Sequence, residues 1–316
     1  MIINSLGAVI TVLLITGLGY FLAAKKIITP QVGTHLASII FWALLPANII
    51  YTFEKNFSRE LLAESWIMLL AILVALLIIH YLALGIAHII KIPKERQGVF
   101  CVIFAMCNSA FVGFPMAQAI FGDQGMPYAV LFFMPNAVLA NTLSYMVIRK
   151  DGDLRLGKET KFSLKEMLKK LVMPHTIAIV VGFILVGFGI QLPSFIMNTC
   201  EYLGTATTAI SLLFIGSLIH KIGLRNMGYE KGFGILMVGR FIISPLVVLG
   251  ICLICHIDHY ATTVFTTQMA LPVMTQVAIQ AEMFGADSVF AAKGVCWTTL
   301  LSFVAIPAVV LLCNTI

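Results

Sequence analysis

The sequence predicts an all-α polytopic membrane protein with ten transmembrane helices, arranged as a 5+5 inverted repeat in which helices 4 and 9 are broken. Three observations lead to this prediction. First, 60% of the 316 residues are hydrophobic and 11% are charged, whereas a soluble protein carries about 25% charged residues. Second, apolar runs of spanning length recur along the whole chain. Third, two of these runs are interrupted near their middle at matching positions.

A bilayer core of about 30 Å requires about 20 apolar residues in a helix. Charged residues, Gly or Pro mark the short connections, for example Lys25–Lys26 and Gly122–Gly125. Recurrent spans of this kind exclude a soluble enzyme, a nucleic-acid-binding protein and a single-span receptor. The predicted spans are residues 4–24, 34–53, 65–90, 98–121, 127–148, 173–192, 196–219, 232–254, 260–284 and 289–312.

Basic residues predict the orientation of these spans, because Lys and Arg concentrate in cytoplasmic loops. With the amino terminus outside, sixteen of the twenty basic residues fall in inner loops, and the outer loops hold Lys55 and Arg59. The net charge of +6 is therefore a topology signal. We expect a multi-pass protein of the cell membrane with both termini extracellular.

A polar stretch at 149–172, predicted as a cytoplasmic loop, separates a first repeat at 1–148 from a second at 173–316. Five spans in each half require the second half to enter the membrane with the opposite polarity. Short echoes agree with a duplication, since Gly17–Gly19 ends span 1 and Gly187–Gly189 ends span 6. Inverted repeats are typical of secondary transporters.

Spans 4 and 9 carry the residues that interrupt a helix. Span 4 contains Asn108 and Ser109, and span 9 contains Pro272 followed by Thr275 and Gln276. Proline removes a backbone donor and clashes with the preceding turn. In lipid, such a break is tolerated where it is buried in protein or lines a cavity. Counted back from a shared Phe-Gly ending, Ser109 and Pro272 occupy equivalent positions.

An inverted repeat would bring the two breaks together near the midplane, where the downstream half-helices point positive dipole ends at the centre. An anionic group, most simply a carboxylate, is what such a site binds. Ordinary proline kinks and amide contacts between helices are the alternative interpretation. The substrate-binding residues expected are Asn108, Ser109, Pro272, Thr275, Gln276 and Asn136 in span 5, with no metal site and no catalytic residue.

Ionisable residues within spans indicate function, because a charge in the bilayer is costly. His80 lies near the middle of span 3 and is a candidate proton relay or, equally, a neutral packing residue. Arg240, Glu282 and Lys293 fall at similar depth on the cytoplasmic side. They form either a mutual ion-pair cluster or a charge relay in which Arg240 receives a substrate carboxylate.

Short motifs carry a family resemblance over essentially the whole chain. Residues 107–109 (CNS) and 113–115 (GFP) in span 4, 270–272 (ALP) in span 9, 44–47 (LLPA) in span 2 and 215–218 (IGSL) in span 7 resemble the auxin efflux carrier family. That family includes plant auxin exporters and bacterial permeases associated with malate or malonate, within the wider bile acid, auxin and arsenite transporter superfamily.

The resemblance implies a fold shared with bile-acid-type sodium symporters. Spans 1, 2, 6 and 7 would form a scaffold, and spans 3–5 and 8–10 a mobile transport domain. Asn108 and Pro272 would mark the two crossings. Span 4 departs from the pattern, because it has no proline at the crossing itself.

The function expected is secondary active transport of a small organic anion, such as malate, malonate or an auxin-like acid, by elevator-type alternating access. A sodium-coupled bile-acid-type symporter is the alternative, followed by an intramembrane enzyme or a channel. No cofactor is expected, and coupling to H⁺ or Na⁺ is left open. The partners expected are the anion and the lipid bilayer, without nucleic acid, and a homodimer is left open.

Overall fold

The computed structural model describes residues 2–159, 172–223, 228–313 and 315. These residues form helices joined by short connections, with no strand among them. The prediction of an all-helical chain is therefore confirmed for this part of the sequence. Most of the expected cytoplasmic loop, at 160–171, lies outside the described residues, as do Arg225 and four of the six lysines of that loop.

Six helical segments of the described chain are long and apolar enough to cross a membrane, and the count of ten spans stays a prediction. One of the six, Ser109–Arg155, is interrupted at Gly122, where φ is 63° and ψ is −160°. The other five are Pro30–Asn56, Arg59–Ile89, Ser194–Lys221, Phe233–Ile254 and Ser288–Cys313.

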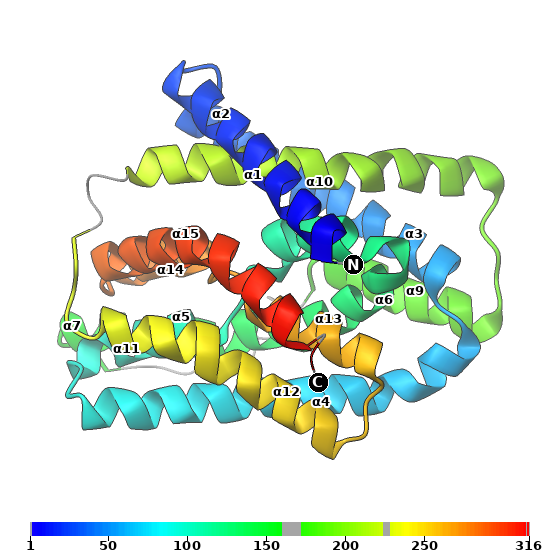
Figure 1. The fold of residues 1–316 in the computed structure, drawn as a ribbon. Coiled ribbons are helices and arrows are strands. Elements are labelled where there is room, and N and C mark those ends of the chain that lie inside the picture. The colour runs from blue at the N-terminus through cyan, green and yellow to red at the C-terminus, as the bar shows by residue number, and fades with distance from the viewer. Residues whose placement is uncertain (1, 160–171, 224–227, 314, 316) are drawn as a thin grey trace. The chain divides into compact units, whose positions relative to one another are not determined.

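The chain runs through these elements in order (Figure 1). Several of the longer helical segments contain a one-turn π-helical stretch, labelled η. The elements are α1 (Ile2–Ala24), α2 (Pro30–Ile39), η1 (Ile40–Leu44), α3 (Leu45–Asn56), α4 (Arg59–Ile89), the short 3₁₀ turn η2 (Lys94–Arg96), α5 (Gln97–Ala105), η3 (Ser109–Gly113), α6 (Phe114–Leu139), η4 (Ala140–Ser144), α7 (Tyr145–Arg155), α9 (Pro174–Phe188), α10 (Ser194–Ile222), α11 (Phe233–Val238), η6 (Gly239–Ile243), α12 (Ser244–Ile254), α13 (His259–Met269), α14 (Gln276–Phe284) and α15 (Ser288–Cys313).

Backbone contacts divide the chain into two compact units. The first comprises residues 1–69, 110–131 and 172–223. In it, α1 crosses α10 at close range, as Figure 1 shows, and α3 packs against α9 and α10. The close α1–α10 approach requires Gly216, because a Cβ there would lie 2.0 Å from the Thr16 carbonyl oxygen. Asn48 on α3 adds a buried hydrogen bond of 3.1 Å to the Gly204 carbonyl.

The second unit comprises residues 70–109, 132–171 and 224–316. Helix α5 forms its core and contacts α7, α11, α14 and α15. All residues from Gly98 to Ala105 are buried, which explains why α5 is apolar around its whole circumference. Both segments that the sequence predicts to be interrupted have their breaks in this unit.

Candidate functional site

The first interruption separates α5 from η3. Helix α5 ends at Ala105, residues 106–108 are not helical, and the chain becomes helical again at Ser109. The buried side chain of Asn136 on α6 holds this interruption. Its Oδ1 accepts from the Cys107 amide at 3.1 Å, and its Nδ2 donates to the Cys107 carbonyl and to Ser109 Oγ, both at 2.9 Å. Asn136 thus replaces the helical hydrogen bonds that the break removes.

The second interruption separates α13 from α14. Helix α13 ends at Met269, and α14 begins at Gln276. Pro272 lies between them and cannot donate a backbone hydrogen bond. The next residue, Val273, donates its amide to Thr298 Oγ1 on α15 at 3.2 Å. A side chain from a neighbouring helix therefore supports this break too.

The two interruptions lie against each other within the second unit. Cys107 and Val273 form an isolated antiparallel β-bridge, and the Asn108 amide donates to the Pro272 carbonyl at 2.8 Å. Both segments are thus broken where the sequence predicts, and their breaks meet. The first break begins at Met106, so a proline is not required at that crossing: backbone pairing and Asn136 satisfy the freed groups.

Arg240 joins the two interrupted segments and is fully buried, at 0% exposure. Its Nη1 donates to the Phe104 carbonyl in the last turn of α5 at 3.1 Å. Its Nε and Nη2 donate to the Leu271 carbonyl at 3.1 and 2.6 Å, and Nη2 also reaches the Pro272 carbonyl at 3.4 Å. Ser244 Oγ lies 3.3 Å from the same Phe104 oxygen. The guanidinium therefore binds backbone oxygens from both breaks.

Local backbone geometry brings Arg240 to this position. It lies in the π-helical turn η6, and such turns are frequent at functional sites. A Cβ on the preceding Gly239 would lie 1.8 Å from the Phe104 ring. Because glycine has none, η6 can pack directly on α5, which places the guanidinium beside the last carbonyls of that helix.

Acidic side chains lie at the amino ends of α5 and α13, the two helices that precede the breaks. Asp151 on α7 is buried and accepts from two amides in the first turn of α5, at 3.0 and 2.8 Å. Asp258 caps α13 and accepts from two first-turn amides at 2.8 and 3.1 Å. In α5 the charges match the helix dipole at both ends, with Asp151 at the amino end and Arg240 at the carboxyl end.

The amino end of α14 lacks such a cap. Its N-cap residue Thr275 makes no side-chain capping bond, and its first turn contains no acidic residue. An uncapped helix amino terminus favours an anion. Thr275 and Gln276 are half-buried here, and their side chains make no hydrogen bond to other described residues. This end of α14 and the guanidinium of Arg240 both contribute positive charge near the junction of the breaks.

The structure brings together the residues that the sequence assigns to the breaks. Among them, Asn136 and Ser109 are engaged with each other, whereas Thr275 and Gln276 have unused polar groups. His80 on α4 is buried, its ring contacts Tyr81 edge-on, and its Nδ1 has no hydrogen-bond partner among the described residues. Within the described part of the chain, these contacts do not link His80 to the breaks.

The expected mutual cluster of Arg240, Glu282 and Lys293 is wrong. Arg240 binds the carbonyl oxygens described above, and Glu282 is exposed near the end of α14. Lys293 pairs instead with Glu230 at 2.7 Å. Glu230 precedes α11 in the sequence, and similar depth along the membrane did not indicate which side chains would meet.

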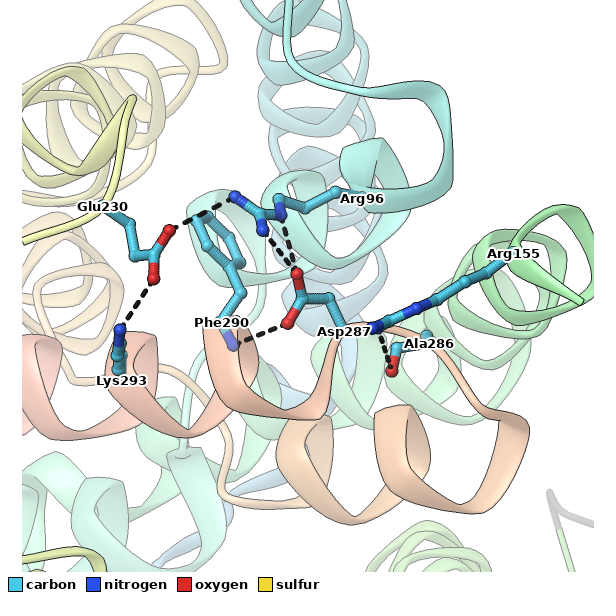
Figure 2. Close-up of polar contacts among 7 residues, drawn as sticks. All are labelled: Arg96, Arg155, Glu230, Ala286, Asp287, Phe290 and Lys293. Atoms are coloured by element: carbon cyan, nitrogen blue, oxygen red, sulfur yellow. Dashed lines mark hydrogen bonds and ion pairs between the residues drawn. The ribbon is translucent and has the colours of Figure 1, made fainter. Parts of the chain in front are cut away.

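Lys293 belongs to an ion network at one end of the second unit (Figure 2). Arg96 contacts Asp287 through Nε at 2.8 Å and Nη2 at 2.6 Å, and its Nη1 lies 3.5 Å from Glu230. Its guanidinium also stacks 4.7 Å from the centre of the Phe290 ring. The network joins the starts of α5 and α15 to the residue that precedes α11.

Three buried residues in or beside the interrupted segments could not be identified from the sequence. The sequence places Asp151 in the loop that follows span 5, whereas in the structure its carboxylate caps α5. Thr298 is one polar residue within the apolar span 289–312, and nothing in the sequence distinguishes it as a support for the second break. Thr267 in the last turn of α13 is buried, with an Oγ1 that has no partner among the described residues. Within the described ranges, no three His, Cys, Asp or Glu side chains gather as a metal site.

Comparison with known proteins assigns the chain to a family. The family model described as membrane transport protein matches residues 4–310. An uncharacterized transporter of Methanocaldococcus jannaschii is 26% identical over 303 residues, covering 94% of this chain and 95% of that protein. One of Methanothermobacter thermautotrophicus is 23% identical over 313 residues, covering 96% and 97%. Protein PIN-LIKES 1 of Arabidopsis thaliana is 25% identical over 119 residues, covering 37% of this chain and 25% of that protein.

The family match extends over nearly the whole chain and includes both interrupted segments. It confirms the resemblance that the motifs around Asn108 and Pro272 indicate. Two of these relatives are named as transporters, and their similarity to this chain extends over almost their full length. The chain is a membrane transporter, and it belongs to the membrane transport protein family, that of the auxin efflux carriers.

Proposed function

We propose that the protein is a secondary active carrier for a small organic anion, most simply a carboxylate. The observation that supports this most directly is the junction of the two interrupted segments. There, a buried guanidinium binds backbone oxygens of both breaks, and no acidic side chain of the described chain pairs with it. A buried cation and an uncapped helix amino terminus both favour a negatively charged ligand.

Thr275 and Gln276 are the side chains proposed to contact the carboxylate. Both lie at the amino end of α14 with unused hydrogen-bonding groups. Asn108 and Ser109 would contribute through the unwound backbone beside them. Asn136 would hold the break in shape, because its side-chain hydrogen bonds go to Cys107 and Ser109.

Alternating access would follow from an inverted repeat of five plus five spans in the cell membrane, with both termini outside. Spans 3–5 and 8–10 would carry the substrate past a scaffold of spans 1, 2, 6 and 7. Such a motion moves the whole site between the two sides of the membrane and requires no opening within it. Either a proton or a sodium ion could drive this motion in a chain of this family.

The test is transport of labelled mono- and dicarboxylates into vesicles that contain the purified protein, at several pH values and with or without Na⁺. Saturable uptake with counterflow is expected of a carrier. Uptake that rises linearly with concentration would indicate a channel, and conversion of the substrate would indicate an enzyme. Absence of any carboxylate flux or binding would refute the proposed substrate class.

A variant pair tests the binding residues. Gln276→Ala should raise KM about three- to tenfold, which corresponds to the loss of one hydrogen bond worth about 0.5–1.5 kcal/mol. The matched control is Gln97→Ala, at the far end of α5, where the amide donates to the Ile92 carbonyl. An equal change of KM in both variants would contradict the role of Gln276.

A further inference from the structure

We propose that Arg240 is a positioning residue that determines the charge preference of the transport site without contacting the substrate. This inference rests on the proposed anion transport and specifies how the site would discriminate charge. It differs from the expectation that Arg240 itself receives the carboxylate.

The donors of Arg240 are directed at the protein. Its Nε, Nη1 and Nη2 all donate to backbone oxygens, and the side chain is 0% exposed. A carboxylate that approached the guanidinium would have to displace the Leu271 and Phe104 carbonyls. Those carbonyls belong to the two segments whose breaks form the site, so displacing them would disassemble it. Arg240 therefore acts on a ligand through the backbone that it holds.

The charge of Arg240 remains even though its hydrogen bonds are satisfied. Arginine is not deprotonated in proteins. The helix dipole places the equivalent of about half an elementary negative charge at the carboxyl end of α5. The full positive charge of Arg240 is larger than this negative partial charge. The carboxyl end of α5, which would otherwise repel an anion, therefore attracts one.

Two half-buried cations of the same unit are arranged differently. Arg96 is paired with Asp287, and Lys293 is paired with Glu230. These pairs cancel their charges locally. Arg240 has carbonyl partners in place of carboxylates, and this leaves its field available at the junction of the breaks.

The experiment compares the affinity of the purified protein for a carboxylate with its affinity for the corresponding neutral amide. The variants are Arg240→Gln, which removes the charge and retains donors for the carbonyls, and Arg240→Lys, which retains the charge. Lys293→Met is the control, because it removes one positive charge from the ion network of the same unit. Thermal unfolding in detergent reports whether each variant is folded.

In the wild type we expect the carboxylate to bind more tightly than the amide. Arg240→Gln should reduce that preference at least about tenfold, which corresponds to about 1.4 kcal/mol. Arg240→Lys should retain the preference while transport slows, because an ammonium cannot hold both breaks in the same geometry. Lys293→Met should leave the preference unchanged.

Two results separate failure of this inference from failure of the proposed function. If the wild type binds neither ligand, or prefers the amide, the proposed anion transport is wrong. If the wild type prefers the carboxylate and folded Arg240→Gln retains that preference, the role of Arg240 is refuted. Should Arg240→Gln not fold, a tenfold loss of preference in folded Arg240→Lys would refute it equally, since that variant keeps the charge.

Discussion

Replacing Asn136 by alanine removes the side chain that holds the first interruption. Three hydrogen bonds are lost: one from the Cys107 amide, and two from Nδ2 to the Cys107 carbonyl and to Ser109 Oγ. All three lie in the buried interior of the second unit. The backbone groups of Cys107 have no helical partner to replace Asn136, because the break separates α5 from η3.

The magnitude follows from the number of bonds. Hydrogen bonds made by polar side chains in membrane proteins contribute about 0.6 kcal/mol on average and up to about 1.7 kcal/mol. Three such bonds therefore give about 2–5 kcal/mol of lost unfolding free energy for Asn136→Ala. Burial favours the upper part of this interval, because unpaired polar groups are left without water.

The assay is equilibrium unfolding of the purified protein in mixed micelles, with Asn141→Ala as the matched control. Asn141 follows Asn136 by little more than one turn and makes a single bond of 2.9 Å, to the Ala137 carbonyl. Its replacement should cost about 0.6–1.7 kcal/mol. Both variants change asparagine to alanine in a helix, so the difference in helix propensity cancels.

A result in which the two variants lose the same unfolding free energy would refute the reasoning. It would mean that Asn136 is not needed to satisfy the interruption. Asn136→Ala should also lower the transport rate, because an unsupported break no longer presents a single geometry. Normal transport by a destabilised variant would separate the structural role of Asn136 from any role in the site.

Three further predictions concern the same unit. Gly98→Ala should reduce the unfolding free energy by about 1–3 kcal/mol, since its Cβ would lie 2.4 Å from a backbone oxygen. Gly85→Ala is the control, because a Cβ there would meet nothing within 4 Å, and it should be neutral or stabilising in the same equilibrium unfolding experiment. Asp151→Ala should cost about 0.5–2 kcal/mol in thermal unfolding, because it uncaps α5, and an unchanged midpoint would contradict the cap. A double-mutant cycle on Lys293 and Glu230 should give a coupling of about 0.2–1 kcal/mol that falls with added salt, and a coupling insensitive to salt would count against the ion pair.

Much of the architecture follows from local sequence. Runs of about 20 apolar residues become helices because every backbone polar group in a membrane must be paired within its own segment. Pro272 interrupts its helix because it lacks an amide donor, and Gly122 separates two helices by adopting a φ of 63°. These effects depend on a residue and its immediate neighbours, so the sequence by itself determines them.

The partners of buried side chains could not be predicted from the sequence in the same way. Depth in the membrane grouped Arg240 with Glu282 and Lys293, but Arg240 binds the Phe104 and Leu271 carbonyls. Those partners lie 136 and 31 residues away in the sequence. A backbone oxygen is present at every residue, so no composition or motif distinguishes the ones that a guanidinium will meet.

The sequence alone therefore determined that the chain is helical and apolar, and that two of its segments break near Asn108 and Pro272. Only the tertiary structure decided that these breaks pair through Cys107 and Val273, and that Arg240 joins them. The physical reason is the range of the interactions. Helix formation and its interruption act within about one turn, whereas pairing and charge compensation require segments distant in the sequence to pack together.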